Sequence, residues 1–199
     1  AMLQGAGLSA KPLSSYHLGF ILGPRLNAVG RLGDAEQAVE LLLTDDPNEA
    51  QALAKSLEEI NRQRQAMCEE LYNTVSKTVT EEKQEDAPVI VVGGEGWHPG
   101  VIGIVASRIS ESYKRPTILI SWEGEEGRAS GRSLPGFDLF AALTRCKEHL
   151  VRYGGHAQAA GLTIQRDKLA QLRQALCQLA AEDGFQLEEP VLELEGELL

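Results

Sequence analysis

The stretch that decides the fold, residues 88–121, begins with Pro88-Val89-Ile90-Val91-Val92 and ends with Pro116-Thr117-Ile118-Leu119-Ile120-Ser121. Both runs are short, apolar and rich in β-branched residues, which is typical of buried strands. Between them, apolar residues recur at helical spacing at Ile102, Val105, Ala106 and Ile109. Residues 88–121 therefore predict a strand–helix–strand unit of an α/β fold.

More strands are predicted downstream of this unit. Arg128-Ala129-Ser130-Gly131-Arg132-Ser133 alternates as a strand does, which places Arg128, Ser130 and Arg132 on one face. The segment from Leu162 to Gln165 is a further apolar strand. We expect an α/β fold with a mixed sheet of four to five strands flanked by helices.

A long helix is predicted upstream of the sheet. Asp46-Pro47-Asn48-Glu49 is a helix-start signal, and no glycine or proline follows it until about residue 83. A helix of about 35 residues would span roughly 50 Å, and such a helix usually connects two domains. We therefore expect a long connecting helix before the sheet.

Residues 23–33 are interrupted by three glycines and predict a constrained loop. Arg25, Asn27 and Arg31 could point the same way from this loop, and an arginine fork or an asparagine amide suits phosphate oxygens. An exposed loop with ordinary surface side chains would have the same composition.

Composition excludes several classes of protein. The chain has the hydrophobic content of a soluble globular protein, with no apolar run of about 18 residues and no signal-like N-terminus, so we expect neither a membrane span nor secretion. The three cysteines are far apart and odd in number, which favours reduced thiols in the cytoplasm. A net charge of −10 is unusual for a protein that binds nucleic acid, so such a site would have to be a local basic patch.

The clearest binding motif is Tyr153-Gly154-Gly155-His156-Ala157-Gln158-Ala159-Ala160-Gly161. Its two glycines allow a tight turn whose N–H groups can lie close to a ligand. We expect His156 at the start of a short helix, beside free amides, where a phosphate or another anion would bind. A tight turn that packs a short helix on a sheet explains the same residues without a ligand.

Two further segments carry groups suited to an anion. Ser130 and Arg132, two residues apart on one strand face, form a compact anion clamp, although an edge strand with outward polar residues would look the same. His98 follows the first strand and precedes Pro99, so it either caps the next helix or faces a ligand.

The order of these motifs resembles one known family. The motifs are Gly23-Pro24-Arg25-Leu26-Asn27-Ala28-Val29-Gly30-Arg31-Leu32, Trp97-His98-Pro99-Gly100-Val101-Ile102-Gly103-Ile104-Val105-Ala106, Ser130-Gly131-Arg132-Ser133 and residues 154–161. Over roughly residues 16–199 the set resembles the RecJ family of single-strand-specific DNA exonucleases, in the DHH phosphoesterase superfamily. The first two motifs indicate this family, whereas a GGH-type motif alone marks DHHA1 domains broadly.

The resemblance implies four parts in the chain. Residues 1–32 would be the end of a preceding DHH domain, and residues 33–86 a helical linker that contains the long helix. Residues 87–185 would be the DHHA1 domain, and residues 186–199 the start of a following OB-like domain.

The resemblance also implies an activity for the full-length protein, namely metal-dependent hydrolysis of single-stranded DNA from its 5′ end, in DNA repair and recombination. The metals, Mn²⁺ or Mg²⁺, would be held by Asp and His residues of the DHH domain, and this chain has no Asp-His-His triplet. We therefore expect no metal ligand and no catalytic residue in this chain, and no cleavage by it alone. Its partners would be single-stranded DNA and the DHH and OB-like domains of the same chain, not a membrane.

In this interpretation His156 and the neighbouring glycine amides would hold a phosphate, and Ser130 and Arg132 would hold the 5′ end or a neighbouring phosphate. Asn27 and Arg31 would hold the strand at the domain junction. The residues expected to bind DNA are Asn27, Arg31, Ser130, Arg132, Gly154, Gly155 and His156, with Arg25 and His98 as further candidates.

Two other functions remain open. A DHH-family phosphodiesterase for very short RNA or cyclic dinucleotides would share the GGH-type motif. A comparison of oligodeoxynucleotides with dinucleotides as substrates of the full-length protein would distinguish this phosphodiesterase from the exonuclease. A non-catalytic interaction module would fit the acidic net charge, and it would bind a partner without preference for DNA ends.

Overall fold

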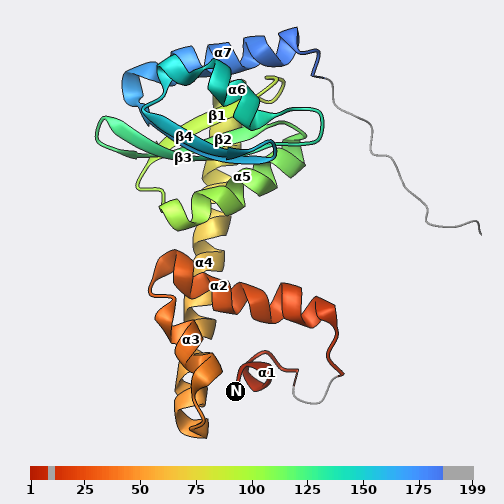
Figure 1. The fold of residues 1–199 in the computed structure, drawn as a ribbon, viewed down its shortest axis with the longest axis vertical. Coiled ribbons are helices and arrows are strands. Elements are labelled where there is room, and N and C mark those ends of the chain that lie inside the picture. The colour runs from red at the N-terminus through yellow and green to blue at the C-terminus, as the bar shows by residue number, and fades with distance from the viewer. Residues whose placement is uncertain (9–11, 186–199) are drawn as a thin grey trace, which may run out of the picture. The chain divides into compact units, whose positions relative to one another are not determined.

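A computed structural model of the chain describes residues 1–8 and 12–185 (Figure 1). The chain divides into two units, the first from Ala1 to Glu70 and the second beginning at Leu71. The expected start of an OB-like domain, residues 186–199, lies outside the described residues. The four-part division expected from the sequence stays a prediction.

The second unit is built on a mixed sheet of five strands in the order β1-β2-β3-β5-β4. β1 and β2 are parallel and α5 connects them, while all other neighbouring strands are antiparallel. The predicted strand–helix–strand unit and the mixed sheet are thereby confirmed. The elements are β1 (Ile90–Glu95), α5 (Pro99–Tyr113), β2 (Thr117–Glu123), β3 (Glu126–Arg132), β4 (Arg152–His156) and β5 (Ala159–Gln165).

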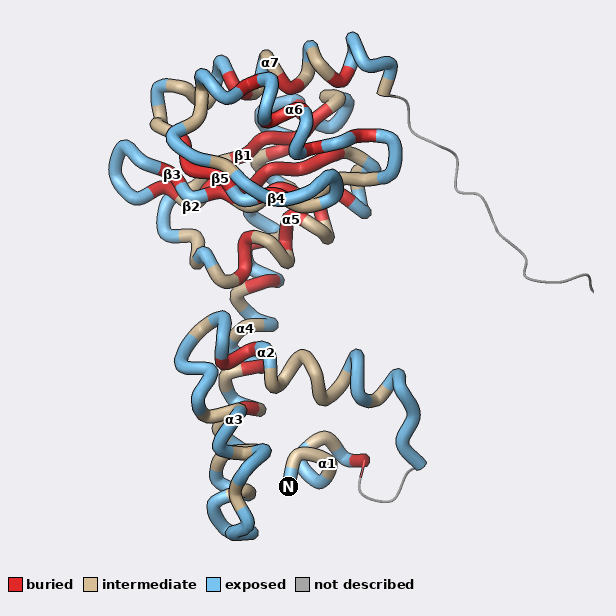
Figure 2. The backbone as a smooth tube through the Cα atoms, in the orientation of Figure 1, coloured by how far each residue is buried: buried red, intermediate tan, exposed pale blue. Residues whose placement is uncertain are grey.

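Helices cover both faces of this sheet, but not equally (Figure 1). α6 (Leu139–Arg145) and α7 (Leu169–Glu182) pack on one face, where a fully buried core includes Ile118, Ile120, Leu143, Leu172 and Leu176. α5 packs on the opposite face over β2 and β3, whereas β4 stays mostly exposed (Figure 2). On the α5 face the sheet is therefore open over β5 and β4 and only partly covered over β3.

The first unit is helical. It contains α1 (Met2–Gly5), a π-helix (His17–Leu22), α2 (Gly23–Leu32), α3 (Glu36–Leu43) and the first part of α4 (Pro47–Glu81). α4 begins with proline at its first position, and Asp46 Oδ1 accepts a hydrogen bond from the Asn48 N–H at 2.8 Å. The predicted long helix is confirmed. None of the helices in the described ranges has the length and hydropathy needed to cross a bilayer.

The loop predicted at residues 23–33 is wrong, because Gly23–Leu32 form the helix α2. Pro24 is the second residue of α2, which directly follows the π-helix that ends at Leu22. Each interior glycine costs a helix about 1 kcal/mol, and the full burial of Ala28 and Val29 offsets this cost. Packing therefore decides the conformation of this segment.

Candidate nucleic-acid interface

The glycine–histidine motif forms a β-hairpin. β4 and β5 pair antiparallel, with Gly155 opposite Ala160 and His156 opposite Ala159. The backbone N–H groups of Ser133 and Leu139 hold the turn by donating to the carbonyls of residues 158 and 157, at 2.8 and 2.9 Å. The helix start expected at His156 is wrong, because this segment pairs with a strand whose apolar residues are buried in the core.

The two glycines of the motif have different roles. Gly155 has φ = +146°, and a Cβ there would lie 2.3 Å from the Ala159 carbonyl oxygen, so the fold itself requires glycine. Gly154 is not among the glycines with positive φ, and a Cβ there would meet no atom within 4 Å. Gly161, its partner on β5, is almost as open, with Ala129 O at 3.8 Å from a built Cβ. Nothing in the fold requires glycine at position 154.

Side chains on the open face form three rows across β3, β5 and β4. Strand pairing sets each row, and alternation along the strands keeps all three on one face. One end therefore carries an arginine and a histidine, the middle has small residues, and the other end carries two arginines. The rows are Arg132–Ala159–His156, Ser130–Gly161–Gly154 and Arg128–Thr163–Arg152.

Arg132 is oriented by its neighbours on β3. Its Nη1 donates to Ser130 Oγ at 2.9 Å and to the Gly131 carbonyl oxygen at 2.7 Å. α5 crosses closely here, since a Cβ on Gly103 would lie 2.8 Å from Arg132 Nη2 and 2.9 Å from Ser130 Oγ. The predicted strand face is confirmed, whereas its role in binding stays a prediction.

A surface hollow of about 260 Å³ lies at this end of the face, lined by Arg132 and His156 among others. His156 Nδ1 accepts a hydrogen bond from the Gln158 N–H at 3.3 Å, so in the neutral ring the proton resides on Nε2, which can donate. Glu111 is the acidic side chain in the lining. The hollow thus offers guanidinium and imidazole donors to an anion.

Ser110 of α5 also lines this hollow, and sequence reasoning missed it. Its side chain is buried, and its hydroxyl has no hydrogen-bond partner in the described part of the chain. Buried polar groups normally have a partner, so this hydroxyl is a candidate contact for a ligand or a water molecule. No sequence signal identified it, because it follows Ile109 on a helix whose periodic residues are apolar.

The remaining candidates are placed elsewhere. His98 caps α5, since its Nδ1 accepts from the Gly100 N–H at 3.0 Å, and this agrees with the capping alternative. In the first unit, the Arg25 guanidinium binds the Glu58 carboxylate and the carbonyl oxygen of residue 21, which gives it a structural role. Asn27 and Arg31 are exposed one turn apart on α2, also in the first unit.

Within the described ranges, no group of three or more His, Cys, Asp and Glu side chains could hold a metal ion. Cys68, Cys146 and Cys177 form no disulfide in the part of the chain that the structure describes. The residues of these ranges therefore do not fit a divalent metal centre.

Comparisons with known proteins identify the family. Residues 86–182 match the DHHA1 domain. The chain is 41% identical over 165 residues to the single-stranded-DNA-specific exonuclease RecJ of Bacillus subtilis, a match that covers 82% of this chain and 21% of that protein. It is 38% identical over 192 residues to the Escherichia coli protein of the same name, covering 92% of this chain and 33% of that one.

A solved structure agrees with these matches. The crystal structure of RecJ from Thermus thermophilus in complex with Mg²⁺ aligns with a TM-score of 0.80 and 36% identity, covering 91% of this chain and 28% of that chain. The chain thus spans about a fifth to a third of the length of these relatives. It belongs to the RecJ family and contains a DHHA1 domain.

Proposed function

We propose that this member of the RecJ family is the single-stranded-DNA-binding part of a longer exonuclease, and that by itself it does not cleave DNA. The names of its relatives describe single-stranded-DNA-specific exonucleases. The described residues do not fit a metal centre, so the metals of such an enzyme would be held by a DHH domain outside this chain. In this proposal the chain acts in the cytoplasm, beside the DHH and OB-like domains of the same protein.

The observation that carries the proposal is that Arg132 and His156 line one hollow at the end of the open sheet face, with Ser130 of the next row hydrogen-bonded to Arg132. A guanidinium fork, a hydroxyl and an imidazole N–H are all hydrogen-bond donors to phosphate oxygens. A 5′-terminal phosphate carries more negative charge than an internal phosphodiester, so these donors would favour the terminal group. The same residues would then orient the 5′ end of a strand.

We propose separately that two residues of the first unit contact single-stranded DNA. Asn27 and Arg31 lie one turn apart on the exposed side of α2, a spacing at which both can contact neighbouring groups of one strand. The backbone of Gly154 would lie under the strand, whereas Gly155 serves the fold. This division of roles refines the expectation that both glycine amides bind phosphate.

Fluorescence anisotropy tests the proposal directly. We expect labelled oligo-dT to bind this chain at about 50 mM salt, where phosphate contacts are strong, and to bind more tightly with a 5′-phosphate. The Arg132→Ala/His156→Ala variant should lose that preference. A Lys147→Ala/His149→Ala variant is the matched control, because it removes one cation and one imidazole that line neither hollow of the open face.

Two outcomes contradict the proposal. Equal affinity for oligo-dT with and without the 5′-phosphate would refute the proposed site for the terminal phosphate. Degradation of single-stranded DNA by the purified chain in Mn²⁺ or Mg²⁺ would show that it cleaves DNA without a DHH domain.

A further inference from the structure

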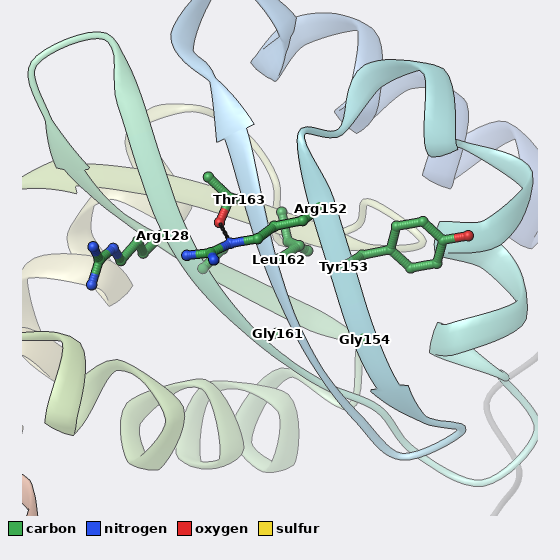
Figure 3. A pocket seen from close by; sticks show the side chains of 8 residues that line it. Arg128, Arg152, Tyr153, Gly154, Gly161, Leu162 and Thr163 are labelled. Carbon is green, nitrogen blue, oxygen red and sulfur yellow. Dashed lines mark hydrogen bonds between the residues drawn. The ribbon is translucent and has the colours of Figure 1, made fainter.

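Two arginines lie at the other end of the open face. A hollow of about 350 Å³ is lined by Arg128 of β3 and Arg152 of β4, with Gly154, Gly161 and Thr163 between them (Figure 3). Tyr153 also belongs to the lining, but Figure 3 shows its ring pointing away from the two arginines. The hollow thus presents cationic groups over a floor with little side-chain bulk.

Arg152 is oriented without being neutralised. Its Nε donates to Thr163 Oγ1 at 2.9 Å, and Figure 3 shows its side chain crossing β5 towards β3. This bond fixes the stem of the side chain and leaves both terminal nitrogens for another acceptor. Within residues 1–8 and 12–185 neither Arg128 nor Arg152 forms an ion pair, and no carboxylate lines the hollow.

Arg128 and Arg152 differ from three other arginines of the second unit, which do pair with carboxylates. The net charge is −10, and three other arginines of the second unit each bind a carboxylate. These are Arg145 with Glu182 and Asp183, Arg166 with Glu95, and Arg173 with Glu82. Two neighbouring arginines without such partners repel one another, and an anion between them would relieve this repulsion.

We propose that Arg128 and Arg152 form a second phosphate-binding subsite, which holds an internal phosphate of the strand whose 5′ end lies at Arg132 and His156. The proposal rests on the proposed function. The row through Thr163 and the row through Arg132 are four strand residues apart, about 13 Å, which leaves room for separate phosphates. The DNA backbone would therefore follow β3, β5 and β4 across the bare glycine floor.

This path predicts recognition without base stacking. The aromatic ring in the lining points away from the open face, so the contacts available there are to phosphate and sugar. Such contacts position a strand but carry no sequence information. Affinity should therefore depend on strand length and salt and not on base composition.

The test compares 5′-phosphorylated oligo-dT of about 12 nucleotides, a length typical of single-strand sites, with the 5′-phosphorylated dinucleotide. In the Arg128→Ala/Arg152→Ala variant we expect roughly tenfold weaker binding of the longer strand and nearly unchanged binding of the dinucleotide. The slope of log K against log salt should become shallower by about 0.7 for each phosphate that the variant no longer neutralises. Lys147→Ala/Lys168→Ala, which removes two lysine charges that line neither hollow, is the control.

The outcomes separate the two proposals. If the arginine variant binds the longer strand like the parent chain, the second subsite is refuted, while a preference for the 5′-phosphate that depends on Arg132 would keep the proposed function. An equal loss for both lengths would mean that these arginines serve the 5′ end or the fold, and it would also refute the subsite. If the parent chain binds neither oligonucleotide, both proposals fail.

Discussion

Replacing Gly154 with alanine separates what the fold needs from what binding needs. A Cβ at this position meets nothing within 4 Å, and the residue has no positive φ, so the folded chain accepts a methyl group without strain. Alanine also has less conformational freedom than glycine in the unfolded chain. We expect the free energy of unfolding to stay the same or to rise by about 0.4–1 kcal/mol.

DNA binding should respond in the opposite direction. A methyl carbon keeps other heavy atoms about 3.5–4.0 Å away, so it would lift the DNA strand from the floor of the row that Gly154 shares with Gly161 and Ser130. Hydrogen bonds to Ser130 or Arg132 need about 2.7–3.2 Å, and such a displacement would break at least one of them. The loss of one bond to a charged group is worth about 1.5–3 kcal/mol, or roughly 10- to 150-fold in affinity.

The assay pairs urea unfolding with anisotropy on 5′-phosphorylated oligo-dT. Gly155→Ala is the matched comparison, because its φ of +146° and the Ala159 oxygen at 2.3 Å predict a loss of at least about 1–3 kcal/mol of stability. If Gly154→Ala binds like the parent chain, no strand approaches the backbone there. If Gly154→Ala unfolds much more easily than the parent chain, the inference from open space is wrong.

Two further predictions concern other parts of the second unit. Gly103→Ala should keep the fold, because the three atoms nearest to a Cβ there belong to the side chains of Arg132 and Ser130. The new methyl group should displace both side chains and reduce the preference for a 5′-phosphate in anisotropy. An unchanged preference would contradict the role of this pair. Burial, with a smaller contribution from Glu148, raises the pKa of the Cys146 thiol from 9.0 to about 11. Iodoacetamide should therefore label this thiol slowly at pH 8 in the folded protein and quickly in urea, which mass spectrometry would measure. Because this pKa is higher in the folded than in the unfolded chain, the thiol's contribution to stability is complete below about pH 9 and should be lost as the pH rises towards 11. Fast labelling of Cys146 at pH 8 in the folded protein would contradict the burial argument.

Local sequence patterns predicted most of the regular structure. The apolar runs of residues 88–121 and the proline-started helix from Pro47 to Glu81 lie where their periodicity placed them. The alternation around Ser130 and Arg132 also predicted which side chains share a face of β3. These features depend on the repeat of the backbone itself, 3.6 residues for a helix and two for a strand, and therefore need no knowledge of distant contacts.

Both errors fall on glycine-rich segments. Residues 23–33 form a helix because Ala28 and Val29 are buried, and His156 lies in a hairpin because its strand pairs with β5. Glycine permits many conformations and specifies none, so contacts from elsewhere in the chain decide its structure.

The sequence by itself determined the α/β class, the long helix and the family to which the chain belongs. Only the tertiary structure decided that β5 lies between β3 and β4, and this order brings Arg132 near His156 and Arg128 near Arg152. It also decided that Gly155 is needed for close packing, whereas Gly154 leaves an open floor. The physical reason is that strand order and the space above a backbone atom depend on contacts between residues far apart in the chain. Local periodicity carries no information on such contacts.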